Sequence, residues 1–239
     1  PAILSLGFLA LIVMGTVLLS LPIATIQPIS ILAAAFTATS AVTVTGLNVV
    51  DTANYTTFGQ LVIAALIQFG GLGFMTCSIL VLTSLQGKMG LSGSITAQEA
   101  LGTHSNQIGS TAKAVIKIAF ITESLGFLGL TLLLAPLKGL KDAMYEAFFL
   151  CISAFNNAGF ALNGNNMTAY VHQPMISFII SLLIITGGIG FLVILDIIKH
   201  KRWQKFTLHT KVMVLGTLAL NIIGCILYWL LERHNAKTI

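Results

Sequence analysis

Long apolar stretches separated by short polar connections dominate the pattern of the chain. A helix needs about 20 apolar residues to cross a hydrocarbon core of about 30 Å. The stretches that are long enough are Ile3–Leu21, Phe58–Leu85, Ala114–Leu134, Pro174–Ile198 and Leu208–Leu231. The pattern therefore predicts an all-α integral membrane protein in which each of these stretches is a spanning helix.

Two further apolar stretches are too short to cross a membrane. Ile29–Ala41 gives about 20 Å of helix at about 1.5 Å per residue, and Leu140–Ala154 gives only slightly more. Each follows a proline or glycine break and precedes a stretch rich in small residues, glycine or asparagine. A helix of this length either lies at the membrane interface or is re-entrant, and length alone leaves both readings open.

The basic residues indicate the orientation of the chain, because Lys and Arg favour cytoplasmic loops. One set of connections carries most of the 12 basic residues. We expect this set and the N-terminus to be cytoplasmic, so that both short helices enter from outside. In the cytoplasmic connection, Thr96 and Glu99 have the spacing of a capping box, which predicts a short surface helix.

The composition excludes other broad classes. Only 8% of the 239 residues are charged and 56% are hydrophobic, with a mean hydropathy of +0.95, unlike disordered or ordinary soluble domains. The net charge of +5 comes from basic residues between apolar stretches. It therefore indicates the orientation of the chain in the membrane, and we expect no nucleic-acid partner. Cys77, Cys151 and Cys225 lie singly, which argues against disulfides and zinc. No phosphate-binding loop or nucleophile elbow is visible, so we expect neither an enzyme nor an organic cofactor.

An internal repeat relates the two short helices to each other. The segment Ser40–Leu47 aligns with Ser153–Phe160, since both begin with Ser-Ala and carry glycine at the seventh place. Further on, Gly70–Phe74 matches Gly187–Phe191 as GGxGF. The first pair of blocks is 113 residues apart and the second pair 117, so the second unit has four extra residues in its outer loop.

Each unit therefore consists of a span, a half-helix, a glycine-bearing loop and a second span. We expect the first unit at residues 1–86, a cytoplasmic connection with a short helix at 87–110 and the second unit at 111–200. Residues 201–239 would form a cytoplasmic loop and the first helix of a third unit. The repeat favours the re-entrant reading of both half-helices.

Non-helical backbone at membrane depth is tolerated only where it lines a protein or water cavity. Carbonyl groups that face a common axis can replace the water shell of a cation. The candidate ligands are the backbone carbonyls of Thr43, Val44, Thr45, Gly46 and Leu47 in one loop and of Asn156, Asn157, Ala158, Gly159 and Phe160 in the other. Without a carboxylate, such a cage favours a monovalent ion over Ca²⁺. Asp51 would concentrate cations at the mouth.

The blocks Ala38–Leu47, Gln68–Thr76, Ile152–Phe160, Thr186–Phe191 and Phe206–Lys211 together resemble the Trk/Ktr/HKT superfamily of potassium transporters. Within it, the chain is most similar to the KtrB-type ion-translocating subunit. The resemblance implies tandem M1–P-loop–M2 repeats, two complete here plus the first helix of a third, with re-entrant pore helices. It also implies potassium uptake across the bacterial inner (plasma) membrane, with a single filter glycine in each repeat.

The resemblance implies partners as well: a homodimer, a cytosolic nucleotide-binding ring of the RCK/KTN type, and two further repeats that complete the pore. In plant relatives, serine in place of the first filter glycine accompanies sodium preference, and Gly46 is like the potassium-type members. The chain holds about half of a family member and opens at Pro1 without a Met. It therefore reads as a fragment.

Several side chains have a structural alternative to ion contact. The glycine clusters are typical of helix-packing faces. The hydroxyls of Thr43 and Thr45 commonly bond backbone, and the amides of Asn156 and Asn157 would brace the loop. Glu123, inside a span, is either functional or paired with a neighbouring span or a second subunit.

The remaining polar candidates lie at the cytoplasmic side. Asp196 precedes Lys199 and His200 by three and four residues, which indicates a solvated salt-bridge face more than a gate. The basic run Lys199–Lys205 is mainly an orientation signal and could also contact anionic lipid or a cytosolic partner.

We expect K⁺ to be the transported ion, with Na⁺ as the alternative. One rival is a sodium-coupled symporter, which needs a closed midplane site flanked by broken helices. The other is a membrane scaffold subunit without transport, whose glycine loops would be packed and dry.

Overall fold

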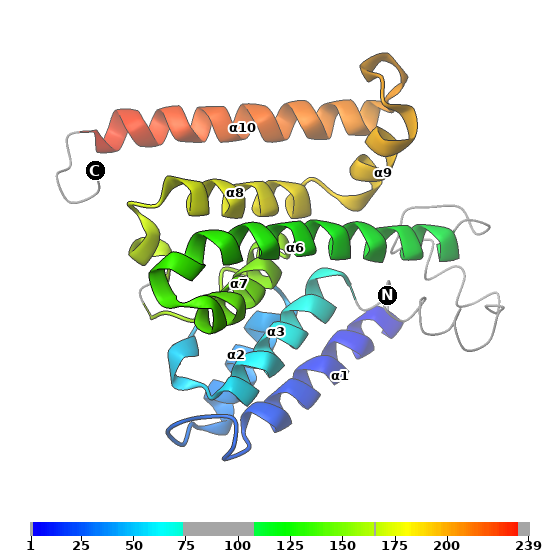
Figure 1. Cartoon of the computed structure of the whole chain (residues 1–239). Coiled ribbons are helices and arrows are strands. Elements are labelled where there is room, and N and C mark those ends of the chain that lie inside the picture. Colours follow the sequence, from blue (N-terminus) through cyan, green and yellow to red (C-terminus); the bar gives the residue numbers. More distant parts are fainter. Residues whose placement is uncertain (1, 74–107, 165, 234–239) are drawn as a thin grey trace. The chain divides into compact units, whose positions relative to one another are not determined.

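The computed structural model describes residues 2–73, 108–164 and 166–233 (Figure 1). These residues form eight α-helices and a few short 3₁₀ turns, and an isolated bridge between Thr25 and Tyr55 is the only β pairing among them. The chain divides into two compact units, Pro1–Gly188 and Ile189–Ile239. The predicted surface helix with Thr96 and Glu99 lies outside the described residues.

The first unit contains two triplets of helices. They are α1 (Ala2–Leu19), α2 (Ile31–Val42) and α3 (Thr57–Gly71), then α6 (Ile108–Lys138), α7 (Leu140–Phe155) and α8 (Pro174–Gly188). In each triplet, every helix packs against the other two, and α3 also packs against α7. Figure 1 colours the first triplet blue to cyan and the second green to yellow.

The helix ends of the two triplets correspond closely. Both α3 and α8 have 15 residues, and their bounds differ by the same 117 positions as the two GGxGF blocks. Helices α2 and α7 end 113 positions apart, at Val42 and Phe155. The spacing read from the sequence is therefore also the spacing of the helices.

Local chemistry explains where these helices begin. The side chain of Ser30 caps α2 by accepting a hydrogen bond from the Ala33 N–H at 3.1 Å. Thr56 caps α3 in the same way through the Gly59 N–H at 3.3 Å. Such caps satisfy amide groups that have no partner within the helix.

The core of this unit forms where α2 and α3 meet the end of α7. The buried cluster combines small side chains of α2 with bulky ones, including Leu19, Ile63, Ile67, Phe149 and Phe160. Alanines at positions 34, 38 and 41 let the neighbouring helices approach α2 closely.

The prediction that Pro174–Ile198 is one continuous helix is wrong. Helix α8 ends at Gly188, and α9 (Phe191–His200) begins after Gly190, whose φ is +95°. A positive φ is incompatible with a right-handed helix, and glycine adopts it without steric cost. The predicted helix Phe58–Leu85 is interrupted in the same way, because α3 ends at Gly71 and Gly73 has a φ of +82°.

Within the described part of the chain, two helices are long and apolar enough by themselves to cross a membrane, Ala112–Lys138 and Leu208–Glu232. Helices α8 and α9 would give a third if they are taken as one broken span. Shorter apolar helices are Ser5–Leu19, Ile31–Val42 and Thr57–Gly71. The described residues are thus helical, as predicted, and they include apolar helices of membrane-spanning length.

The second unit contains α9, a 3₁₀ turn at Trp203–Lys205 and α10 (Leu208–Glu232). Asp196 of α9 accepts hydrogen bonds from His200 Nδ1 at 2.6 Å, the Thr207 N–H at 2.9 Å and Thr210 Oγ1 at 2.5 Å. The pairing of Asp196 with His200 was predicted. Its bonds to the first turn of α10 were not, and they fix the junction of these two helices.

Candidate functional site

The end of α2 is closed by a Schellman cap. The Val44 N–H donates to the Ala41 carbonyl at 3.3 Å, and the Thr45 N–H donates to the Ser40 carbonyl at 2.9 Å. These are the two bonds of the motif, which needs a left-handed residue at the position of Val44. Val44 indeed has a φ of +56°. A β-branched residue in this region stores strain, of order 1–3 kcal/mol, and such strain concentrates at functional sites.

The end of α7 repeats this cap bond for bond. The Asn157 N–H donates to the Ala154 carbonyl at 3.1 Å, and the Ala158 N–H donates to the Ser153 carbonyl at 2.7 Å. The left-handed residue here is Asn157, with a φ of +59°. Asparagine tolerates this conformation better than valine does.

Beyond the caps, both loops have a positive φ at every second residue. We refer to Thr43–Leu47 as the first loop and to Asn156–Phe160 as the second loop. Two residues after Val44, Gly46 has a φ of +81°, and two residues after Asn157, Gly159 has a φ of +73°. In an extended strand, successive side chains point to opposite faces. A change in the sign of φ at alternate residues can instead turn successive carbonyls toward one side, as coordination of a single ion requires.

The two loops meet at their glycines. A Cβ atom at Gly46 would lie 2.4 Å from the Ala158 carbonyl oxygen and 3.3 Å from the Gly159 Cα. A Cβ atom at Gly159 would lie 3.6 Å from the Gly46 Cα. Segments 113 residues apart in the sequence therefore place matching glycines against each other.

The threonine hydroxyls of the first loop bond within their own segment. Thr43 Oγ1 donates to the Thr39 carbonyl at 2.8 Å and lies 2.6 Å from Thr45 Oγ1. This agrees with the interpretation that these side chains bond locally.

Asn156, the first residue of the second loop, is bonded to Gln68 of α3 and, through Gln68, linked to Glu123 of α6. Its Nδ2 donates to Gln68 Oε1 at 2.8 Å and to the Ile152 carbonyl at 2.9 Å. Gln68 Nε2 in turn donates to the two carboxylate oxygens of Glu123 at 2.9 and 3.1 Å. The bracing role of Asn156 and the pairing of Glu123 were among the predictions. Gln68 was missed, although a lone amide in an apolar stretch was the available signal.

Asn157 braces the same loop against α8. With its amide turned so that the oxygen faces the Gly188 N–H, the two atoms are 3.3 Å apart, and the amide nitrogen donates to the Ile184 carbonyl at 3.2 Å. Both asparagines of the second loop thus use their side chains to hold backbone in place.

The glycine clusters of α3 and α8 lie against the ends of the half-helices. A Cβ atom at Gly70 would lie 2.1 Å from the Val42 carbonyl oxygen, and one at Gly187 would lie 1.7 Å from the Phe155 carbonyl oxygen. Val42 and Phe155 are the last residues of α2 and α7. These glycines therefore allow close helix packing, which was the structural alternative weighed for them.

A buried ionic cluster near the second loop was not predicted. Glu146 of α7 pairs with Lys138 Nζ at 2.6 Å and accepts hydrogen bonds from Asn163 Nδ2 at 2.8 Å and from the Tyr170 hydroxyl. Burial, followed by the adjacent Glu146 carboxylate, raises the pKa of Tyr170, which keeps this hydroxyl a donor. The cluster ties the segment after the second loop to α7.

Replacing Lys138 by methionine is expected to destabilise this region, because the Glu146 side chain is only 7% exposed and would lose its cationic partner. Lys138 itself is partly exposed, so we expect a loss of about 1–2 kcal/mol, or about 3–6 °C in the thermal midpoint of the purified protein. Lys141→Met, which replaces an exposed lysine in the first turn of α7, is the control. Equal midpoints for the two variants would contradict this role.

A cavity of about 290 Å³ is lined by Asn157 and Gly159 of the second loop, and two larger ones lie near the loops without being lined by them. One of about 490 Å³ lies between α3, α6 and α7; its walls are mostly apolar and include Gln68 and Glu123. The other, of about 450 Å³, includes Asp51, Asn54 and Ser30, on the side where α2 begins. Among the described residues, no group of three or more His, Cys, Asp or Glu side chains could hold a metal ion.

The comparisons with known proteins agree with one another. The TrkH family, described as cation transport protein, matches residues 3–232. The Ktr system potassium uptake protein B of Bacillus subtilis is 45% identical over 242 residues, covering 100% of this chain and 54% of that protein. Its namesake in Vibrio alginolyticus is 41% identical over 244 residues, with coverages of 100% and 53%.

A third relative carries sodium in its name. The potassium/sodium uptake protein NtpJ of Enterococcus hirae is 37% identical over 239 residues, covering 98% of this chain and 52% of that protein. The chain thus spans about half the length of each of these relatives. The resemblance seen in the sequence motifs is confirmed, and with its apolar helices the chain is a membrane protein. It belongs to the TrkH family of cation transport proteins.

Proposed function

We propose that the chain supplies two walls of a potassium-selective path across the membrane. The walls are the backbone carbonyls of the first and second loops, with Gly46 and Gly159 as their filter glycines. The observation that carries the proposal is the matched backbone geometry of these loops, with equal caps and alternate positive φ values. The names of the potassium uptake relatives support K⁺ as the ion.

The physical basis is replacement of the water shell of the ion. Carbonyl oxygens held at fixed positions compensate a cation for its lost water. The carboxyl ends of α2 and α7 lie directly before the loops, and each helix dipole would add about 0.5–1 kcal/mol for a cation there. Because the loop carbonyls are neutral, a monovalent ion suits them better than Ca²⁺.

The architecture follows from the same proposal. Helices α1, α2 and α3 form one M1–P-loop–M2 repeat within residues 1–86. Helices α6 to α9 form a second repeat, expected at 111–200, although α6 already begins at Ile108. Helix α10, within 201–239, is the first helix of a third. The cytoplasmic connection expected at 87–110 lies mostly outside the described residues, and its last three positions belong to α6.

In this arrangement α2 and α7 are re-entrant helices that enter from outside, and the N-terminus is cytoplasmic in the bacterial inner membrane. Two walls do not enclose an ion, so further repeats complete the path. A homodimer and a cytosolic RCK/KTN ring are the proposed partners, and the words "Ktr system" in the names of two relatives support a partner subunit.

Sodium coupling is the second candidate, because two observations favour it. One relative is named a potassium/sodium uptake protein. The break between α8 and α9 is the kind of discontinuity that symporter sites use. Passive potassium flux remains the main proposal, because equal caps and alternate positive φ values in both loops suit a row of carbonyl ligands.

The test is flux through the complete protein as its gene encodes it, purified and placed in liposomes. We expect potassium to move down its own gradient with no sodium present, and sodium to compete weakly. Flux that requires a sodium gradient would favour the second candidate. Correctly inserted protein that carries neither ion would overturn both and leave the scaffold reading.

A further inference from the structure

We propose that Gln68 and Glu123 are positioning residues that hold the second loop in its ion-selective geometry through Asn156. This inference rests on the proposed potassium path and adds the residues that set its discrimination between K⁺ and Na⁺. Neither residue belongs to a loop: Gln68 comes from α3 and Glu123 from α6. We call the three side chains the brace.

The brace is a directed chain of hydrogen bonds. Asn156 Nδ2 donates to Gln68 Oε1, and Gln68 Nε2 donates to both oxygens of Glu123. An ionised carboxylate can only accept hydrogen bonds, so the amide nitrogen of Gln68, its donor end, must face Glu123. With its nitrogen toward Glu123, Gln68 presents its oxygen to Asn156, and this is the orientation that Asn156 needs.

Asn156, the residue that the brace holds, lies where α7 ends and the second loop begins. Asn156 is the C-cap of α7, with φ −82° and ψ 1°, and the left-handed Asn157 follows it. Its amide is confined on another side as well, because a Cβ atom at Gly71 would lie 2.1 Å from Asn156 Oδ1. A shift of this side chain would therefore turn the start of the second loop.

The first loop has no equivalent brace from the other triplet among the described contacts. Thr43, the counterpart of Asn156, bonds to Thr39 and Thr45 in its own segment. The counterpart of Gln68 in α8, 117 residues on, is Ile185, which has no polar side-chain atom. Coupling through the brace thus runs from the first triplet to the second loop.

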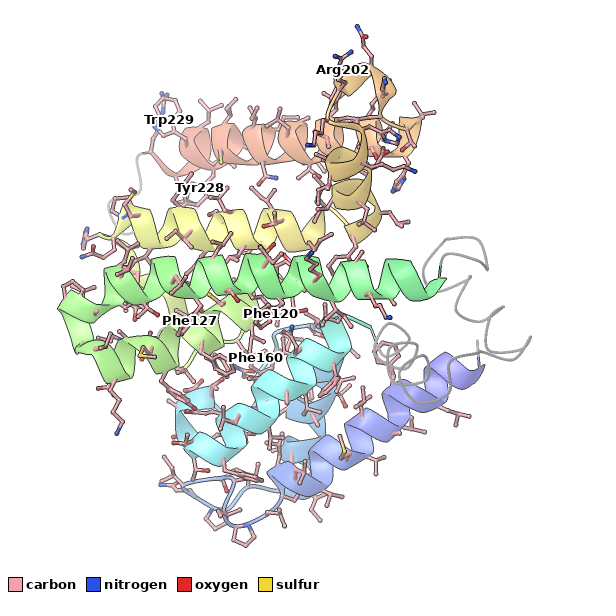
Figure 2. All side chains as sticks on the ribbon, turned by 45° about the vertical axis from the view of Figure 1, so that its right-hand side comes forward. Phe120, Phe127, Phe160, Arg202, Tyr228 and Trp229 are labelled. Carbon is pink, nitrogen blue, oxygen red and sulfur yellow. The ribbon has the colours of Figure 1, made fainter. Side chains whose placement is uncertain are left out.

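The setting of Glu123 fits this role. Its carboxylate borders the 490 Å³ cavity beside Phe120 and Phe127, which Figure 2 labels on α6. A carboxylate inside a membrane span is costly and is usually retained for a function or a specific partner. The two bonds from Gln68 supply that partner.

The experiment measures potassium and sodium uptake by the complete protein in bacteria that lack other potassium uptake systems, with membrane abundance measured in parallel. Gln68→Leu removes both links of the brace. We expect the ratio of sodium KM to potassium KM to fall about tenfold, because one buried hydrogen-bonded link of this kind is worth about that factor. A packing role alone would lower abundance or maximal rate and leave this ratio unchanged.

An exchange of the two groups provides the rescue. In the double variant Gln68→Glu/Glu123→Gln, the carboxylate at position 68 accepts from the amide at position 123 and from Asn156 Nδ2. We expect its KM ratio to return to within about twofold of the parent, whereas Gln68→Glu alone stays low. Ser124→Ala, which lines the same cavity, is the control and should match the parent.

The outcomes separate this inference from the function on which it rests. Normal discrimination in Gln68→Leu overturns the brace, and so does a double variant that inserts normally but stays unselective. If Gln68→Leu fails to insert, the double variant decides alone. Gly46→Ser is measured in the same series: if it too leaves discrimination intact, the proposed potassium path fails, and the brace fails with it.

Discussion

Replacing Gly46 by alanine is expected to abolish most of the discrimination between potassium and sodium. The new Cβ would lie 2.4 Å from the Ala158 carbonyl oxygen, which is backbone of the second loop and has no rotamer to change. The φ of +81° adds about 1–2 kcal/mol of strain for any residue with a Cβ. Both loops must therefore move, and we expect the selectivity ratio to fall about 10–100-fold.

Gly159→Ala provides a matched comparison. Its φ of +73° imposes the same strain, but its Cβ would lie 3.6 Å from the Gly46 Cα, an ordinary contact. We expect a loss of about tenfold or less. Gly164→Ala, with its nearest neighbour at 3.5 Å and no positive φ, should be neutral. Ion-uptake ratios measure all three variants, and an effect of Gly159→Ala as large as that of Gly46→Ala would contradict the steric explanation.

The half-helices and loops were predictable because their signals are local. Length limits, glycine positions and the 113-residue spacing are all readable along the chain, and α2 and α7 end within one residue of the predicted ends at Ala41 and Ala154. The alternate positive φ values follow from the glycines in part only. Nothing local indicates that Val44 adopts one, since valine avoids this region.

Partners distant in the sequence were not predictable. Gln68 lies 55 residues from Glu123 and 88 from Asn156, and hydropathy patterns contain no information about which polar side chains meet. The Glu146 cluster was missed for the same reason. The break before α9 was missed because hydropathy reports length and polarity, whereas the break depends on the φ of Gly190.

The second large effect is expected at Gly187. If this glycine serves helix packing, its replacement lowers stability; if it contacts the ion, its replacement alters ion selectivity. In Gly187→Ala, the Cβ would lie 1.7 Å from the Phe155 carbonyl oxygen, so α8 must move away from the end of α7. We expect a loss of about 3 kcal/mol or more, which lowers the thermal midpoint of the purified protein by about 10 °C. The potassium to sodium ratio of the surviving protein should change little by comparison.

The control for this prediction is Gly188→Ala, at the next position of the same helix. In Gly188→Ala, the Cβ would lie 3.5 Å from Asn157 Nδ2, an ordinary contact, and alanine favours helix over glycine by about 1 kcal/mol. We therefore expect a midpoint equal to or slightly above that of the parent. Gly70→Ala, with 2.1 Å to the Val42 carbonyl oxygen, should resemble Gly187→Ala because the same contact recurs in the first triplet. A stable Gly187→Ala protein with altered ion preference would instead place this glycine at the ion path.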